Sequence, residues 1–135
     1  MLITIIPLKK YISFIKHLLK KKIETDAPDF NGLIETVLCV DELLVNIIEH
    51  NKNININEKI SLKLGFTNEF LLVEITEPAA ENTPDKKDFD KDMFITKYKG
   101  AGFFFIENTA DEFSVENIGG KNIYRFKIKN NGKHQ

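Results

Sequence analysis

Glu42, Asn46 and His50 are polar residues spaced four apart in a segment, residues 33–51, whose apolar spacing predicts a helix. Residues four apart in an α-helix lie one above the other on one face. The carboxylate of Glu42 and the amide oxygen of Asn46 can therefore point into one pocket. A solvated helix face shows the same pattern, so the spacing alone does not decide between a site and a plain surface. For His50 three roles stay open: capping the helix end, interacting with the helix dipole when protonated, or facing a ligand.

Gly100 and Gly102 flank Ala101 at the start of a short segment, about residues 101–109, that is expected to be helical. Glycine has no Cβ, so its backbone can approach a phosphate closely, and the N-terminus of a helix favours anions. A phosphate-bearing ligand fits these residue types. A lone pair of glycines is a weak signal, as is an acid followed four residues later by an asparagine.

The rest of the chain predicts the scaffold that positions these residues. The hydrophobic pattern predicts, in order, a strand at residues 2–6, helices at about 8–22 and 33–51, strands at 60–66 and 70–76, a helix at about 101–109, a strand at 113–116 and a last strand through 124–128. Helices and strands come in groups, which indicates two layers rather than a doubly wound parallel sheet. We therefore predict an α/β two-layer sandwich of the α+β class, with a mixed, mainly antiparallel sheet and the helices on one face.

Residues 77–99 break all periodicity and contain two prolines among interleaved acids and lysines. A loop of this length inside a compact domain is usually functional or disordered. We expect it to be a mobile lid, and we expect the polar tail, residues 130–135, to be frayed. The 135 residues are expected to form one domain.

The composition limits the classes of function. The chain is 42% hydrophobic and 29% charged, as in globular domains, and its net charge is −1. No global field attracts nucleic acid or a membrane, so we expect neither as a partner. Cys39 is the only cysteine, which excludes an internal disulfide and a cysteine-based zinc site. The N-terminal apolar run is too short for a membrane span and has no positive leader, so we expect a cytoplasmic protein.

The segment Val-Asp-Glu-Leu-Leu-Val-Asn-Ile-Ile-Glu-His, residues 40–50, resembles the N-box of the GHKL ATPases, which have the Bergerat or histidine-kinase-like fold. It looks most like the N-box of the anti-sigma-factor serine kinases, where an acid, an asparagine and often a histidine share one helix at this spacing. The resemblance implies that Asn46 ligates a Mg²⁺ ion that bridges the phosphates of ATP, a cation that prefers oxygen ligands. It also implies that Glu42 is the general base for a serine hydroxyl or water, and that His50 lies at the nucleotide.

Residues 99–106, Lys-Gly-Ala-Gly-Phe-Phe-Phe-Ile, resemble the Gly-x-Gly box that closes the nucleotide lid and opens the next helix in the same family. The resemblance implies that Gly100, Ala101 and Gly102 border the phosphates. The order of the elements and the spacing of the two boxes match the family over nearly the whole chain, about residues 3–128.

The adenine-binding motif of the family, Asp-x-Gly, is altered in this chain. Glu77 stands where the family has aspartate, and Ala79 where it has glycine. The resemblance implies that Glu77 accepts a hydrogen bond from the adenine amino group and that Ala79 borders the base. The Glu77 carboxylate lies one methylene further from the backbone, and hydrogen bonds depend sharply on distance. The altered motif leaves two interpretations open, with adenine bound or not.

Two functions from different classes follow. In the first, the chain is an anti-sigma-factor-like serine/threonine-protein kinase. It binds Mg-ATP, phosphorylates a serine of a small antagonist (anti-anti-sigma) protein and alternately holds a sigma factor. In the second, the chain is a degenerate GHKL-fold module that binds such a partner without nucleotide. The resemblance also makes a homodimer plausible. A plain domain with neither role would require both boxes to be coincidental.

Overall fold

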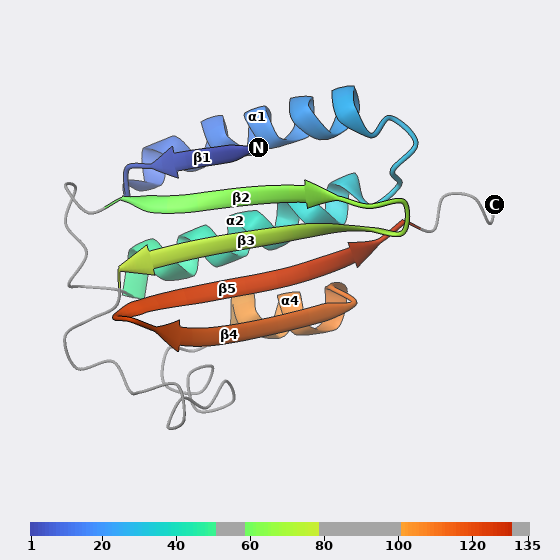
Figure 1. The fold of residues 1–135 in the computed structure, drawn as a ribbon. Helices are drawn as coiled ribbons and strands as arrows, with labels where there is room; N and C mark the ends of the chain where they lie inside the picture. Colours follow the sequence, from blue (N-terminus) through green and yellow to red (C-terminus); the bar gives the residue numbers. More distant parts are fainter. Residues whose placement is uncertain (51–58, 79–100, 131–135) are drawn as a thin grey trace.

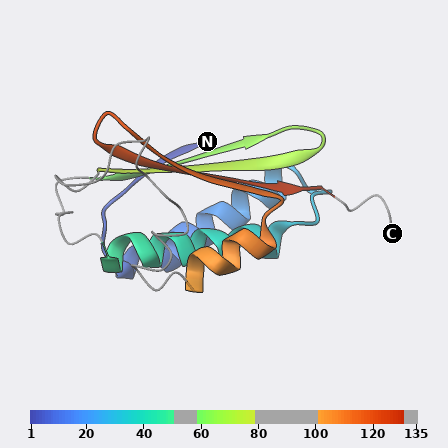
Figure 2. The same cartoon turned by 90° about the horizontal axis from the view of Figure 1, so that it is seen from below.

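The computed structural model describes residues 1–50, 59–78 and 101–130, and within them it shows a sheet covered by helices (Figure 1). The elements are β1 (Leu2–Ile5), the 3₁₀ turn η1 (Lys9–Tyr11), α1 (Ile12–Asp26), α2 (Leu33–His50), β2 (Ile60–Phe66), β3 (Phe70–Pro78), α4 (Ala101–Thr109), β4 (Glu112–Ile118) and β5 (Lys121–Lys129). The helices all lie on one face of the sheet (Figure 2). The predicted fold class, a two-layer α+β sandwich, is confirmed.

The sheet has the strand order β1-β2-β3-β5-β4. Every pairing among the described strands is antiparallel, so the mixed sheet that we expected is antiparallel throughout this part of the chain. Gly119 and Gly120 join β4 to β5 with φ of 57° and 77°. Two-residue hairpin loops favour positive φ at both central positions because that geometry matches the twist of the strands, and glycine adopts it without strain.

The hydrophobic core lies between the two layers. In β3 and β5 alternate side chains are buried, which is the period-2 pattern of strands with one covered face. The largest fully buried side chains are Ile5, Leu19, Ile23, Leu43, Leu44, Ile60, Leu62, Leu71, Ile75, Tyr124 and Phe126. They come from both layers, so the sheet and the helices stabilise each other mainly by burying apolar surface.

The helix α2 is the middle helix of its layer, with α1 on one side and α4 on the other. Its buried stripe faces the sheet, and its flanks contact the two neighbouring helices. No helix within the described ranges combines the length and the apolar character that a membrane crossing requires.

Three boundaries differ from those predicted. α1 begins at Ile12 and ends at Asp26, not at about 8 and 22, because its buried stripe continues to Ile23 and the Lys22–Asp26 ion pair, 2.7 Å, supports the last turn.

β3 continues to Pro78, so the first two residues of the expected lid are strand, held by pairing with β5. Asn130 belongs to the expected frayed tail, but its backbone N–H donates to the carbonyl of Glu69 at 2.8 Å. The remaining lid residues and residues 131–135 lie outside the described part of the chain.

Candidate functional site

Asn46 and Glu42 lie one turn apart on α2, on a side that the flanking helices define. Asp41 contacts Lys16 of α1 at 3.5 Å and so marks the side of α2 that faces α1. Asn46 follows five residues later, which at 3.6 residues per turn places it roughly on the opposite side. That is the side on which α4 packs. Helical periodicity therefore directs the amide of Asn46 towards the α4 side of the layer, with Glu42 beside it near the outer face.

The amide nitrogen of Asn46 is buried and has no hydrogen-bond partner among the described residues. A buried donor without a partner costs about 1–3 kcal/mol, so native proteins seldom keep one without a reason. An acceptor oxygen of a bound molecule would satisfy it. This is the one observation at the predicted site that points directly to a ligand.

Cys39 lies on the same flank of α2, one turn before Leu43, and is fully buried. We predicted that it lies opposite the apolar stripe, and that prediction is wrong, because the contacts of α2 with its neighbours extend the buried surface around the helix. Burial, and then the charges of Glu35 and Glu42, raise the pKa of the Cys39 thiol to about 12. The thiol thus stays protonated at neutral pH and acts as a small packing group, as the sequence indicated.

Glu77 is buried on the helix-facing side of the sheet, with 2% of its surface exposed. Asn122, directly opposite on β5, donates its amide N–H to Glu77 Oε1 at 3.0 Å. The hydroxyl of Tyr124 donates to the same oxygen. Asn117 on β4 donates to Asn122 Oδ1 at 2.8 Å. We call Glu77, Asn117, Asn122 and Tyr124 the Glu77 cluster.

The sequence reasoning missed Asn117 and Asn122 and took Tyr124 only as a core residue. One signal was available for Asn122. It lies in phase with Tyr124, Phe126 and the rest of the alternating buried positions of β5, so period 2 places a polar residue on the covered face. A polar residue on a covered face requires a partner.

The structure gathers the predicted site at one end of the domain. The C-terminal end of α2, the end of β3, the start of β5 and the start of α4 lie together there (Figure 1). Ala101 and Gly102 form the first turn of α4, and His50 ends α2, although their side chains lie outside the described part. Ala79 and Gly100 fall outside the described residues. Glu42 and Asn46 share a helix face, whereas Glu77 joins them only through this common end.

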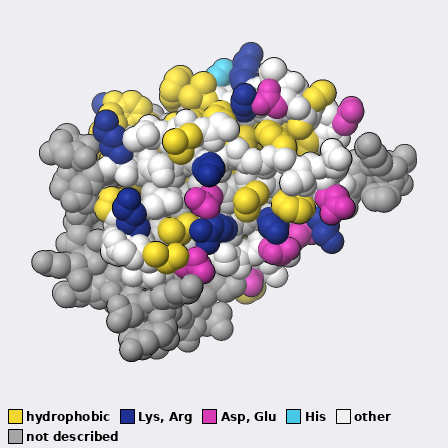
Figure 3. Space-filling view, viewed as in Figure 1, with side chains coloured by type: hydrophobic (Ala, Val, Ile, Leu, Met, Phe, Trp, Pro, Cys, Tyr) yellow, Lys and Arg dark blue, Asp and Glu magenta, His cyan; other side chains and the backbone are white. Residues whose placement is uncertain are grey.

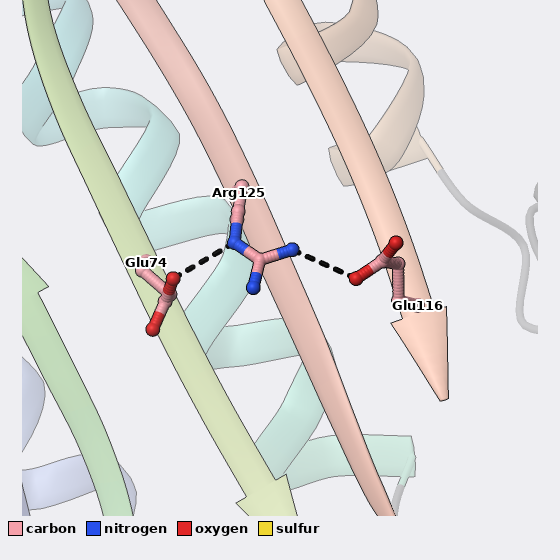
Figure 4. A network of polar contacts seen from close by, with 3 residues as sticks. All are labelled: Glu74, Glu116 and Arg125. Atoms are coloured by element: carbon pink, nitrogen blue, oxygen red, sulfur yellow. Dashed lines mark hydrogen bonds and ion pairs between the residues drawn. The ribbon is translucent and has the colours of Figure 1, made fainter. Parts of the chain in front are cut away.

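The opposite face of the sheet carries charges of both signs that are interleaved (Figure 3). Arg125 of β5 lies between two carboxylates there, 2.8 Å from Glu74 on β3 and 2.8 Å from Glu116 on β4 (Figure 4). Hydrogen bonds to Glu74 and then Glu116 raise the pKa of Arg125, so the cation is stable in its charged form. This network ties three strands together on the face away from the helices and forms no part of the site.

A family model described as the histidine kinase-like ATPase domain matches residues 8–128 of the chain. The chain belongs to this family. The resemblance to the GHKL ATPases that the two sequence boxes carry is therefore confirmed. No curated protein matches the sequence significantly.

Two solved structures show the same fold. A chain of the crystal structure of the SiaB–SiaC complex from Pseudomonas aeruginosa has a TM-score of 0.63 and 14% identity, over 96% of this chain and 89% of that chain. The nucleotide-free catalytic domain of the histidine kinase ThkA has a TM-score of 0.52 and 16% identity, over 100% of this chain and 99% of that chain. At such identities the likeness is one of fold.

The residues of this histidine kinase-like domain fit Mg-ATP in one respect that the structure itself supplies. The amide of Asn46 has an oxygen for a hard cation and a buried, unpaired nitrogen for a phosphate oxygen. Within the described ranges no cluster of three metal-binding side chains occurs, so a metal ion here would take most of its ligands from the nucleotide and from water.

Proposed function

We propose that this domain is a regulatory protein kinase that binds Mg-ATP and phosphorylates a serine of a partner protein. The unpaired amide nitrogen of Asn46, one turn from Glu42, is the observation that carries the proposal. Family membership supports nucleotide binding. The anti-sigma-factor-like role, in which a small antagonist protein is the substrate and a sigma factor the alternative partner, rests on the resemblance of the N-box.

The residues take the following roles. Asn46 holds Mg²⁺ and one phosphate oxygen through its amide. The first turn of α4, with Gly100, Ala101 and Gly102, presents backbone N–H groups to phosphate oxygens, as helix N-termini do. His50 lies at the same phosphates, and Glu77 with Ala79 borders the base.

When bound, Mg-ATP supplies the phosphoryl group and a cation that neutralises its charge. Glu42 accepts the proton of the attacking serine hydroxyl, which is the role of a positioned carboxylate in such reactions. Its partly buried position on α2, beside Asn46, brings a base to the place where the metal ion is held. Positioning and charge stabilisation provide most of the catalysis of phosphoryl transfer, so few side chains are required.

The partner of this kinase is a protein. One structural relative is a chain of a two-protein complex, SiaB–SiaC, which supports protein binding by this fold. Exposed apolar side chains on α1, α2 and α4, including Phe14, Ile34 and Phe104, offer contact surface on the helical layer. A homodimer is part of the proposal by family resemblance.

The test uses wild type and Glu42→Ala with Mg-ATP and candidate antagonist proteins from the same organism, and it follows phosphoserine by mass spectrometry. Loss of the base lowers the transfer rate by about 10²–10⁴-fold and leaves Mg-ATP affinity unchanged. Glu35→Ala, on the same helix and exposed, is the matched control. Transfer by Glu42→Ala at the wild-type rate would refute the assignment of the base.

A specific observation favours a second function, a partner-binding module that does not need nucleotide. Glu77 is almost fully buried and already accepts hydrogen bonds from Asn122 and Tyr124. A base can reach its carboxylate only if neighbouring side chains move. The module predicts equal partner affinity with and without Mg-ATP. A tenfold difference in the dissociation constant would exclude it.

A further inference from the structure

Three members of the Glu77 cluster stand in one row across three strands. Glu77 of β3 pairs with Asn122 of β5, and Asn122 pairs in turn with Asn117 of β4. Tyr124 lies two residues further along β5 and reaches Glu77 diagonally, a contact that cross-strand geometry allows for long side chains. The register of the sheet thus builds a polar row on the face that the helices cover.

The hydrogen bonds of this row have a fixed direction. An ionised carboxylate can only accept, so the Asn122 amide must turn its NH₂ group towards Glu77. Its carbonyl oxygen then faces Asn117, which must donate. Asn117 therefore acts on Glu77 through Asn122 without touching it, and the reversed amide would place two acceptors against each other.

The row holds a carboxylate that stability alone does not require. The groups that donate to Glu77 from β5 are neutral, and Asn122 and Tyr124 are 4% and 1% exposed. Burying a carboxylate is costly, and an apolar side chain at this position would pack without that cost. Glutamate also has one more rotatable bond than aspartate, so it needs more support to keep one orientation.

We propose that Asn117, Asn122 and Tyr124 are positioning residues that fix the Glu77 carboxylate to accept a hydrogen bond from the exocyclic amino group of a purine base. This inference rests on the proposed nucleotide site. Two donors leave a carboxylate with further acceptor capacity, since its oxygens offer about four lone-pair positions. A carboxylate fixed before binding loses less conformational entropy on binding, which strengthens the contact with the base.

The test compares ATP with purine riboside triphosphate, which lacks the amino group, by calorimetric titration of the full chain with Mg²⁺. Wild type is expected to prefer ATP by about tenfold or more, the discrimination that one well-placed hydrogen bond supplies. Asn117→Ala and Tyr124→Phe each lower this preference by about threefold or more and leave the affinity for the analogue unchanged. Ser114→Ala, on β4 but on the exposed face, is the control and keeps the full preference.

The outcomes separate this inference from the proposed function. If wild type binds neither nucleotide, both fail. If both nucleotides bind in an Asn46-dependent way but the variants keep the wild-type preference, only the positioning role fails. Equal weakening of ATP and the analogue would show a purely structural role and would also overturn it. Tyr124→Phe keeps the ring in the core, so it gives an answer even if Asn117→Ala folds poorly.

Discussion

Asn122 donates its amide hydrogen to the carboxylate of Glu77 across β5 and β3, with 3.0 Å between the nitrogen and the oxygen. On the other face of the same two strands, Glu74 is held by the guanidinium of Arg125. The exposed carboxylate thus has a cation, whereas the buried one has neutral donors. An ion pair near the surface contributes to stability, but a buried carboxylate held by neutral groups is a feature more typical of binding sites.

Asn46→Leu is expected to stabilise the ligand-free domain by about 1 kcal/mol, because it removes a buried donor without a partner in the described structure. Urea unfolding measures the change. Asn108→Leu on α4 is the control, since the Asn108 amide already donates to the Phe104 carbonyl at 2.7 Å. Destabilisation by Asn46→Leu would mean that the amide has a partner in the ligand-free protein.

Gly32→Ala is expected to destabilise the domain by about 1–3 kcal/mol through overpacking. A Cβ on Gly32 would lie 2.5 Å from Ile128 Cγ2 and 2.6 Å from Phe30 Cζ. Gly65→Ala is the matched control, because a Cβ there meets no heavy atom within 4 Å. Thermal unfolding of the two variants gives the comparison, and an equal effect of both would contradict the close packing at Gly32.

Cys39 gives the stability of the domain a dependence on alkaline pH. The thiol loses its proton near its ordinary pKa of 9.0 in the unfolded chain but only at about 12 in the folded one. Between these values the unfolded state binds fewer protons, so the free energy of unfolding falls as pH rises. Cys39→Ala should reduce this fall, whatever its effect at pH 7. An unchanged slope would show that the thiol is not shielded.

Arg125→Met is expected to lower the free energy of unfolding by about 1 kcal/mol, because it leaves Glu74 and Glu116 without their shared cation. The effect should shrink in 1 M salt, where partly exposed charges are screened. Lys63→Met on the same face of β2 is the control for loss of a surface cation. A salt-independent loss would indicate that the Arg125 stem stabilises the sheet by packing.

The local pattern of the sequence was enough to predict most of the elements. α2 ends one residue before its predicted end, and α4 has the predicted range, since each depends on a helical spacing contained in the segment itself. The pair Glu42 and Asn46 was found for the same reason, because positions four apart share a face in any helix.

The features that the sequence did not predict depend on contacts between elements. Cys39 is buried because α2 has neighbours on both sides, and no pattern within α2 states how many helices flank it. The donors to Glu77 depend on the register of three strands, and a shift of one residue would turn Asn122 to the other face. Helix α1 continues past its lysine cluster because Ile23 reaches the core.

Calorimetric titration of the full chain with Mg-ATP, in wild type and Asn46→Ala, tests the central claim most directly. The account predicts Mg²⁺-dependent binding to wild type that the substitution weakens by about tenfold or more, the loss of roughly one charge-assisted contact. Bound nucleotide should also raise the melting temperature of wild type more than that of the variant. No heat and no rise in melting temperature, or equal binding by both proteins, would contradict a nucleotide site at Asn46.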